Sequence, residues 1–204
     1  DGIRRYLLPP ADVVVDPKQE GDTYPFKGIC GAVVAYKLIC CLYERLGLLD
    51  EKKEELEDLL ELAAFATVCD VMELLDENRI IVKFGLEHMK HTRNQGLRAL
   101  MDVSGTDREK LSAYTIGFVL GPCLNATGRL DTAVRALQLL EAEDRTEAVQ
   151  YAAALKQLND SRKEMTEDYV KLALRTVEEG PLRHDRVLVI FLPDCHESLA
   201  GIIA

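Results

Sequence analysis

The spacing of apolar residues predicts a chain built mostly of helices. Residues 31–46 carry apolar side chains on nearly every side, which is typical of a largely buried helix. Residues 50–70 begin with a charged run and become apolar from Leu59 onward, so one end of this helix is expected in solvent and the other in a core. Capping signals predict shorter helices at 76–90, 95–101, 131–140 and from about residue 197.

Two runs predict strands instead. Residues 11–16 are rich in valine and lie between prolines, and residues 186–192 form the nearly uniform apolar run typical of a buried parallel strand. Residues 116–129 contain three glycines and a proline, so we expect no single regular element there.

A long helix is expected between these parts, because residues 144–179 contain neither Gly nor Pro. At about 1.5 Å per residue it would span roughly 50 Å, more than a compact domain needs. A coiled-coil stalk is the alternative, but the apolar residues do not hold a strict heptad. The predicted fold class is therefore helix-rich α/β: part of one parallel-sheet domain, a connecting helix, and the first strand of a second α/β domain.

Composition and charge narrow the function classes. The 204 residues include 25 Lys and Arg against 35 Asp and Glu, a net charge of −10, which argues against nonspecific coating of nucleic acid but allows a local basic site. The six cysteines form no CxxC pair and are expected to be reduced thiols. No apolar run approaches the roughly 20 residues of a membrane span, so we expect a soluble, cytoplasmic protein.

The chain starts at Asp1 without Met and ends in an apolar run, so we expect an internal fragment of a longer protein.

Asp70 and the segment 120–130 are the main candidates for chemistry. Asp70 follows the uncharged stretch 62–69, and a buried carboxylate needs a partner such as a divalent cation; the alternatives are a capping role or a pair with Arg79. In 120–130, Gly and Pro allow sharp turns, Asn125 offers an amide and Arg129 a fork suited to phosphate. An ordinary turn with Arg129 paired to a surface Glu remains the alternative.

His196 follows the second predicted strand, where α/β sheets place ligand-binding loops, although it could equally be a surface histidine. No GxSxG, HExxH, P-loop or GxGxxG element occurs.

Taken in order, six segments resemble the RecJ-type single-stranded-DNA-specific exonucleases of the DHH phosphoesterase superfamily. The resemblance covers essentially the whole chain and rests on order and spacing: residues 9–19, 24–31, 66–71, 77–79, 120–130 and 196–204. It implies that residues 1–142 are the C-terminal part of a DHH catalytic domain, 143–180 a linker helix, and 181–204 the start of a DHHA1-type substrate-binding domain.

The resemblance also implies a 5′-to-3′ exonuclease of DNA repair and recombination that hydrolyses phosphodiester bonds with Mn²⁺ or Mg²⁺. Asp70 matches a catalytic, metal-binding aspartate. Asn125, Gly128 and Arg129 match an Asn-Ala-x-Gly-Arg motif that orients a DNA phosphate, and His196 and Gly201 match a substrate-facing motif. Implied partners are single-stranded DNA, single-strand-binding protein and a helicase, with no membrane.

Departures from the family pattern also matter. Cys123 stands where many relatives have Arg, so one positive contact is expected to be absent. The family's Asp-x-Asp and Asp-His-His motifs precede the part that matches, so this chain is predicted to be inactive alone. Two alternatives remain: a DHH-superfamily phosphodiesterase acting on oligoribonucleotides or cyclic dinucleotides, and a non-enzymatic helical interaction protein in which Asp70 and Arg129 are structural.

Overall fold

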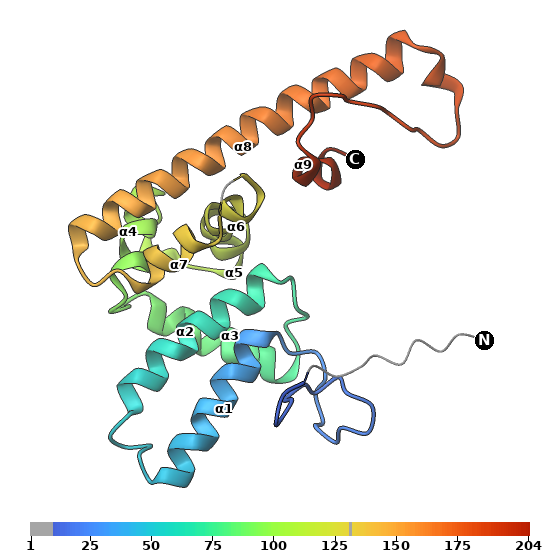
Figure 1. Ribbon diagram of the computed structural model, residues 1–204. Helices are drawn as coiled ribbons and strands as arrows, with labels where there is room; N and C mark the ends of the chain where they lie inside the picture. The colour runs from blue at the N-terminus through green and yellow to red at the C-terminus, as the bar shows by residue number, and fades with distance from the viewer. Residues whose placement is uncertain (1–9, 131) are drawn as a thin grey trace. The chain divides into compact units, whose positions relative to one another are not determined.

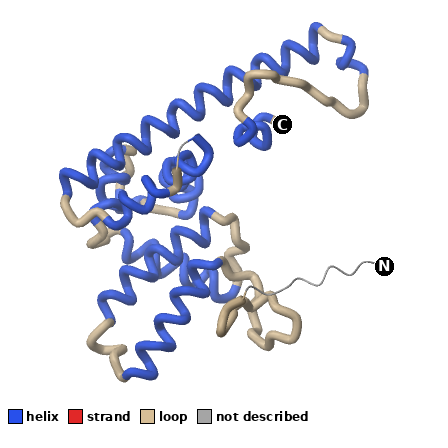
Figure 2. The backbone as a smooth tube through the Cα atoms, in the orientation of Figure 1, coloured by secondary structure: helices blue, strands red, loops and turns tan. Residues whose placement is uncertain are grey.

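The computed structural model describes residues 10–130 and 132–204, and the regular elements in these ranges are all helical (Figures 1 and 2). Contacts divide the chain into two compact units, which we call unit 1 (Asp1–His91, described from residue 10) and unit 2 (Thr92–Ala204). Each unit has its own buried residues and is described by itself.

Unit 1 contains three helices, with α2 packed against both neighbours: α1 (Gly31–Leu46), α2 (Lys53–Cys69) and α3 (Asp76–Met89). A Cβ added to Gly85 of α3 would lie 2.3 Å from the Ala64 Cβ of α2, so glycine is what allows this close approach. The fully buried Asn78 amide donates to the Gly28 carbonyl at 2.7 Å and ties the preceding loop to α3. The core consists of Ile29, Cys30, Val33, Ala63, Ala64, Ile81 and Val82.

The bounds predicted for α1 are confirmed, but its predicted burial is wrong. Val33 is the buried residue of this helix, while Leu38, Leu42 and Leu46 are each at least half exposed. An apolar pattern on all sides of a helix indicates that it can be buried, but only packed neighbours bury it. In the described part of unit 1, α2 supplies the main packing against α1.

The two predicted strands are not formed in the described residues. Residues 11–16 and 186–192 are free of regular structure, and the run expected to be a buried strand exposes 84% of Phe191. A strand is stable only when a neighbour takes up its backbone N–H and C=O groups. Neither segment finds such a neighbour among residues 10–130 and 132–204, so the sheet in the predicted fold class is not confirmed.

Unit 2 is organised along α8 (Arg145–Glu179), the long helix expected from the sequence. The Asp144 carboxylate caps it by accepting from the N–H groups of Thr146 at 2.8 Å and Glu147 at 2.9 Å. It packs against α4, α6, α7 and α9. The other elements of the unit are α4 (Gln95–Val103), η1 (Arg108–Lys110), α5 (Ala113–Thr115), η2 (Ile116–Leu120), α6 (Gly121–Leu130), α7 (Val134–Glu141), η3 (Pro181–His184) and α9 (Glu197–Ile203).

The segment expected to be broken by glycines and a proline is helical through α5, η2 and α6. Its middle part, η2, is a π-helical turn in which the Gly121 N–H donates to the Ile116 carbonyl, five residues back. Pro122 follows directly after this turn, and a proline inside a helical segment is tolerated where a π-helical turn already interrupts the regular hydrogen bonding. The expectation of no single regular element is therefore confirmed, since η2 and α6 divide residues 116–129, although both elements are helical. The predicted cap residue Asp131 lies outside the described residues, and the helix that follows begins at Val134.

Helices α4 and α7 approach each other through Gly96. A Cβ added there would lie 1.9 Å from the Leu139 carbonyl oxygen, and this contact is with backbone, which cannot move aside cheaply. The neighbouring Asn94 side chain donates to the Leu140 carbonyl at 2.8 Å, so the same site also fixes the end of α7.

We expect Gly96→Ala to lower the free energy of unfolding by about 2 kcal/mol or more, because the added methyl group overlaps the α7 backbone. Chemical denaturation followed by circular dichroism measures the change. Gly128→Ala is the matched control, since nothing lies within 4 Å of its added Cβ; in the interior of α6 it should raise stability by up to about 1 kcal/mol. Equal effects of the two substitutions would contradict the close approach.

Candidate nucleic-acid interface

Asp70 lies at the C-terminal end of α2 and is exposed to solvent. Its N–H continues the helix by donating to the Ala66 carbonyl at 2.9 Å. The buried residues of the last turns precede it, and the chain reaches the surface where the helix ends. The expectation of a buried carboxylate is therefore wrong in this structure, and the described residues show no ion pair between Asp70 and Arg79. Asp70 occupies the C-cap position of α2 through its backbone, and its carboxylate forms no hydrogen bond that caps the following turn in the described residues.

The residue after Asp70 has an unusual backbone. Val71 adopts a left-handed conformation (φ 54°), and the Met72 N–H donates to the Thr67 carbonyl at 3.1 Å, which is the pattern of a Schellman helix end. Glycine normally occupies this position because a β-branched side chain crowds the backbone there. Gly47 occupies the equivalent position at the end of α1, with φ 68°.

Because Val71 is strained and 88% exposed, Val71→Gly should stabilise the chain by about 1 kcal/mol, with little packing to lose. The reverse substitution at the matching position, Gly47→Val, should destabilise it by a similar amount. Denaturation midpoints measure both effects. A loss of stability in Val71→Gly would show that the valine side chain makes a contact worth more than the strain.

The described residues around Asp70 do not fit a metal centre. Burial and the nearby Asp70 charge raise the pKa of the Cys69 thiol to about 12, so this thiol stays protonated and is a poor ligand. No group of three or more His, Cys, Asp or Glu side chains gathers anywhere in the part of the chain that the structure describes. The assignment of Asp70 as a metal ligand thus stays a prediction based on resemblance.

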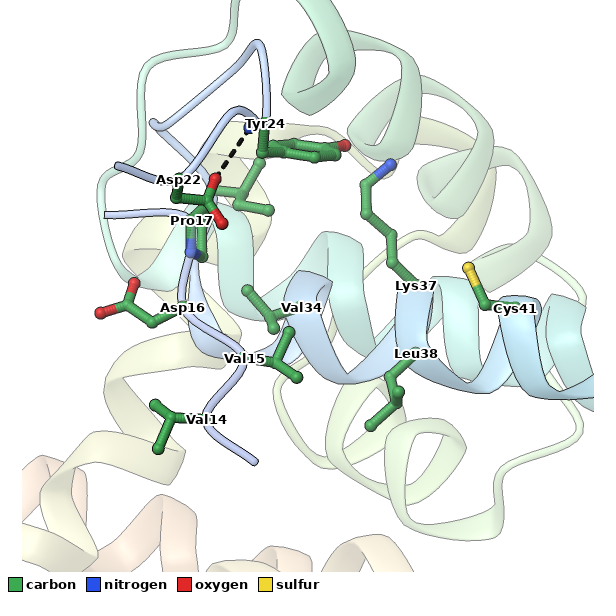
Figure 3. A pocket seen from close by; sticks show the side chains of 11 residues that line it. Val14, Val15, Asp16, Pro17, Asp22, Tyr24, Val34, Lys37, Leu38 and Cys41 are labelled. Atoms are coloured by element: carbon green, nitrogen blue, oxygen red, sulfur yellow. Dashed lines mark hydrogen bonds between the residues drawn. The ribbon is translucent and has the colours of Figure 1, made fainter. Parts of the chain in front are cut away.

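Unit 1 also contains a pocket of about 370 Å³ between the segment Val14–Pro17 and one face of α1 (Figure 3). Two of its charged groups form ion pairs: Lys37 lies 2.9 Å from Glu77, and Asp22 lies 2.7 Å from Lys27. The third, the Asp16 carboxylate, accepts from the Lys18 N–H at 2.9 Å. The Tyr24 hydroxyl also donates to Glu77. A binding site normally offers several convergent polar groups that are free to hold a ligand, whereas Lys37, Asp22 and the Tyr24 hydroxyl of this pocket already bind neighbouring side chains.

In unit 2 the candidate phosphate-binding residues lie on a helix rather than in a turn. Asn125 and Gly128 are exposed and stand three residues apart on α6, so they share one face. Cys123, Ala126 and Thr127 are buried. The Arg129 main chain belongs to α6, and its side chain lies outside the described part of the structure.

Positive charge from α8 lies beside this helix. Burial raises the pKa of the Cys123 thiol; Lys156 and Lys163 oppose that shift, while Asp160 on the same helix adds to it. Lys156 is paired with Asp160 at 2.5 Å. Lys163 is exposed and forms no ion pair with the residues that the structure describes. Although Cys123 itself is neutral, α8 therefore brings an ammonium group to its neighbourhood.

The two C-terminal candidates lie on α9 or at its start. His196 is the cap residue of α9: its Nδ1 lies 2.7 Å from the Ser198 hydroxyl and accepts from the Ser198 N–H at 3.3 Å. Gly201 is exposed. Leu199 is fully buried where α9 packs against α8 and α6, and the Tyr169 hydroxyl donates to the Asp194 carbonyl in the preceding loop. The structure thus places Asn125, Gly128, His196 and Gly201 on two helices that contact each other, whereas Asp70 belongs to unit 1.

Sequence reasoning missed the aromatic pair of Tyr114 and Phe118, which lies just before these residues in α5 and η2. The rings are stacked with centroids 4.7 Å apart, and each residue is about two-thirds exposed. Their spacing of four residues was the available signal, but it marks a surface pair only once the segment is known to be helical.

No family model matches the chain. Curated relatives do: the single-stranded-DNA-specific exonuclease RecJ of Bacillus subtilis is 39% identical over 197 residues, covering 97% of this chain and 24% of the relative. RecJ of Escherichia coli is 34% identical over 207 residues, covering 97% of this chain and 36% of the relative. This chain is homologous to a segment of RecJ.

Solved RecJ structures agree with this. RecJ of Thermus thermophilus in complex with Mn²⁺ matches with a TM-score of 0.75 and 32% identity, over 88% of this chain and 26% of that one. A second RecJ bound to manganese matches with a TM-score of 0.76 and 31% identity, over 89% of this chain and 44% of that one. The chain therefore spans roughly a quarter to a third of the length of the curated RecJ proteins it matches. Among its described helices, none is long and apolar enough to cross a membrane.

Proposed function

We propose that this chain is part of the catalytic core of a single-stranded-DNA exonuclease and that its own contribution is to bind the DNA strand. The observation that carries the proposal is the similarity to RecJ over 97% of the chain. The proposed parent enzyme hydrolyses phosphodiester bonds from the 5′ end, in DNA repair and recombination in the cytoplasm, with single-strand-binding protein and a helicase as partners.

The residues that bind DNA in this proposal lie on α6 and α9. Amide and guanidinium groups are suited to phosphate oxygens, so Asn125 and Arg129 would fix the backbone of the strand. Exposed Gly128 leaves room for the strand to approach α6 closely. His196 and Gly201 are proposed to contact substrate from α9, which packs against α6.

The same proposal divides the chain into three parts. The first is the C-terminal part of a DHH catalytic domain (residues 1–142), the second is a linker helix (143–180), and the third is the start of a DHHA1-type domain (181–204). The parent enzyme would use Mn²⁺ or Mg²⁺, with Asp70 as the ligand supplied by this chain. The described residues supply no complete set of ligands, so no step of hydrolysis is assigned to them.

The first test measures binding of the chain to a fluorescent, 5′-phosphorylated oligothymidine as salt is varied. Because the net charge is −10, binding must come from a local site, and losing one phosphate contact should show clearly. Arg129→Ala should weaken binding and lower the slope of log K against log salt by about 0.7. Lys53→Ala, which removes the same charge from a 75% exposed side chain in unit 1, is the control and should change neither.

Equal losses for the two variants would contradict a phosphate contact at Arg129. Preference for an oligoribonucleotide of matching length would favour the phosphodiesterase alternative, and absence of any nucleic-acid binding would favour the interaction-protein alternative.

A second test asks whether the chain cleaves DNA. A 5′-labelled single strand incubated with the 204-residue chain and Mn²⁺ should remain intact, because the described residues form no metal-binding cluster. RecJ of Bacillus subtilis serves as the active control under the same conditions. Release of 5′ nucleotides by the chain itself would show that it carries a complete active site.

A further inference from the structure

Tyr114 and Phe118 form an unusual surface feature of unit 2. Tyr114 is 68% and Phe118 66% exposed, although large aromatic side chains gain most from burial. Their rings are stacked, with an interplanar angle of 25°, so one face of each ring is covered by the other and the exposed area comes from the outer faces and edges of the pair. Contact between two side chains four residues apart stabilises a helix by only a few tenths of a kcal/mol. This gain accounts for the contact between the rings but not for their exposure to solvent.

The backbone connects this surface to the proposed phosphate site. Tyr114, Phe118 and Asn125 belong to successive elements of one helical segment, α5, η2 and α6. Phe118 and Asn125 are both exposed, whereas Leu120, Cys123 and Ala126 of the same segment are buried. Seven residues of helix place Phe118 and Asn125 roughly 10 Å apart along the axis. One oligonucleotide can therefore reach both. The π-helical turn that contains Phe118 is a type of irregularity often found at functional sites.

We infer that Tyr114 and Phe118 are a stacking platform for the bases of single-stranded DNA whose phosphates are held beside Asn125. The inference rests on the proposed function and adds the residues that distinguish a single strand from a duplex. Every base has a flat face that stacks on an aromatic ring without regard to sequence, whereas in a duplex those faces are already stacked on one another. On α8, which packs against α6, Lys156 is paired with Asp160, whereas Lys163 is exposed and forms no ion pair with the described residues. One unpaired ammonium group is therefore available to a DNA strand near α6.

The test compares oligothymidine with an abasic oligonucleotide that has the same length, the same 5′ phosphate and the same backbone charge. The wild-type chain should bind oligothymidine roughly ten-fold more tightly than the abasic strand. Tyr114→Leu and Phe118→Leu keep an apolar, helix-forming side chain but remove the ring. Each should weaken binding of oligothymidine by several-fold to ten-fold and leave binding of the abasic strand unchanged.

Phe84→Leu is the matched control, since Phe84 is a half-exposed aromatic residue on α3 in unit 1. It should bind both strands as the wild type does.

As a second readout, an oligonucleotide containing 5-iodouracil should crosslink on irradiation to the peptide that contains Tyr114 and Phe118. Helicity measured by circular dichroism should be equal in all variants.

The outcomes separate the two proposals. If the wild type binds single-stranded DNA but does not distinguish it from the abasic strand, or if the crosslinks fall elsewhere, the platform is overturned while the proposed function stands. If the wild type binds no single-stranded DNA, both are overturned. A loss shared by Phe84→Leu, or accompanied by reduced helicity, assigns the aromatic pair to helix stability and overturns the platform.

Discussion

Unit 2 depends on one packed stripe along the first half of α8. Ala148, Ala152, Leu155 and Asn159 recur at helical spacing and are buried to within 1% of complete. Small side chains at two of these positions let neighbouring helices approach closely, and α4, α6 and α7 all pack against α8. The placement of Asn125 and Gly128 on an exposed face follows from this, because Cys123, Ala126 and Thr127 are the α6 residues turned inward.

What the sequence predicts well is local. The extent of α8 agrees with the stretch free of Gly and Pro, since the Asp144 cap and the Gly180 end act through hydrogen bonds and backbone freedom within a few residues. The predicted strands are not formed for the opposite reason. Residues 186–192 have the composition of a strand, but a strand also needs a neighbouring strand for its backbone hydrogen bonds, and composition does not show whether one is present. Residues 116–129 are not one regular element, as predicted, but η2 and α6 are both helical. Glycine and proline are tolerated here because a π-helical turn adjusts the hydrogen bonding.

For the candidate site, too, the sequence predicts the type of chemistry better than the exposure of the residues. The residue types at Asn125, Gly128 and Arg129 indicated phosphate chemistry, and the structure shows the first two exposed on one helix. The burial of Asp70 was inferred from eight preceding uncharged residues, and that pattern does not reveal that α2 ends at the surface. The exposure of Tyr114 and Phe118 could not be predicted for a related reason. Aromatic residues in a sequence usually indicate a core, and only the fold shows that these two lie at the surface.

The π-helical turn has a consequence for how this region of the chain can evolve. One residue corresponds to about 100° of rotation in an α-helix, so the extra residue accommodated in η2 sets the direction in which α6 faces relative to Tyr114 and Phe118. Replacing side chains within residues 116–120 would leave that angle unchanged. Deleting one residue would turn Asn125 roughly a quarter of a circle away from the rings. The number of residues between the two surfaces is therefore under tighter constraint than their identity.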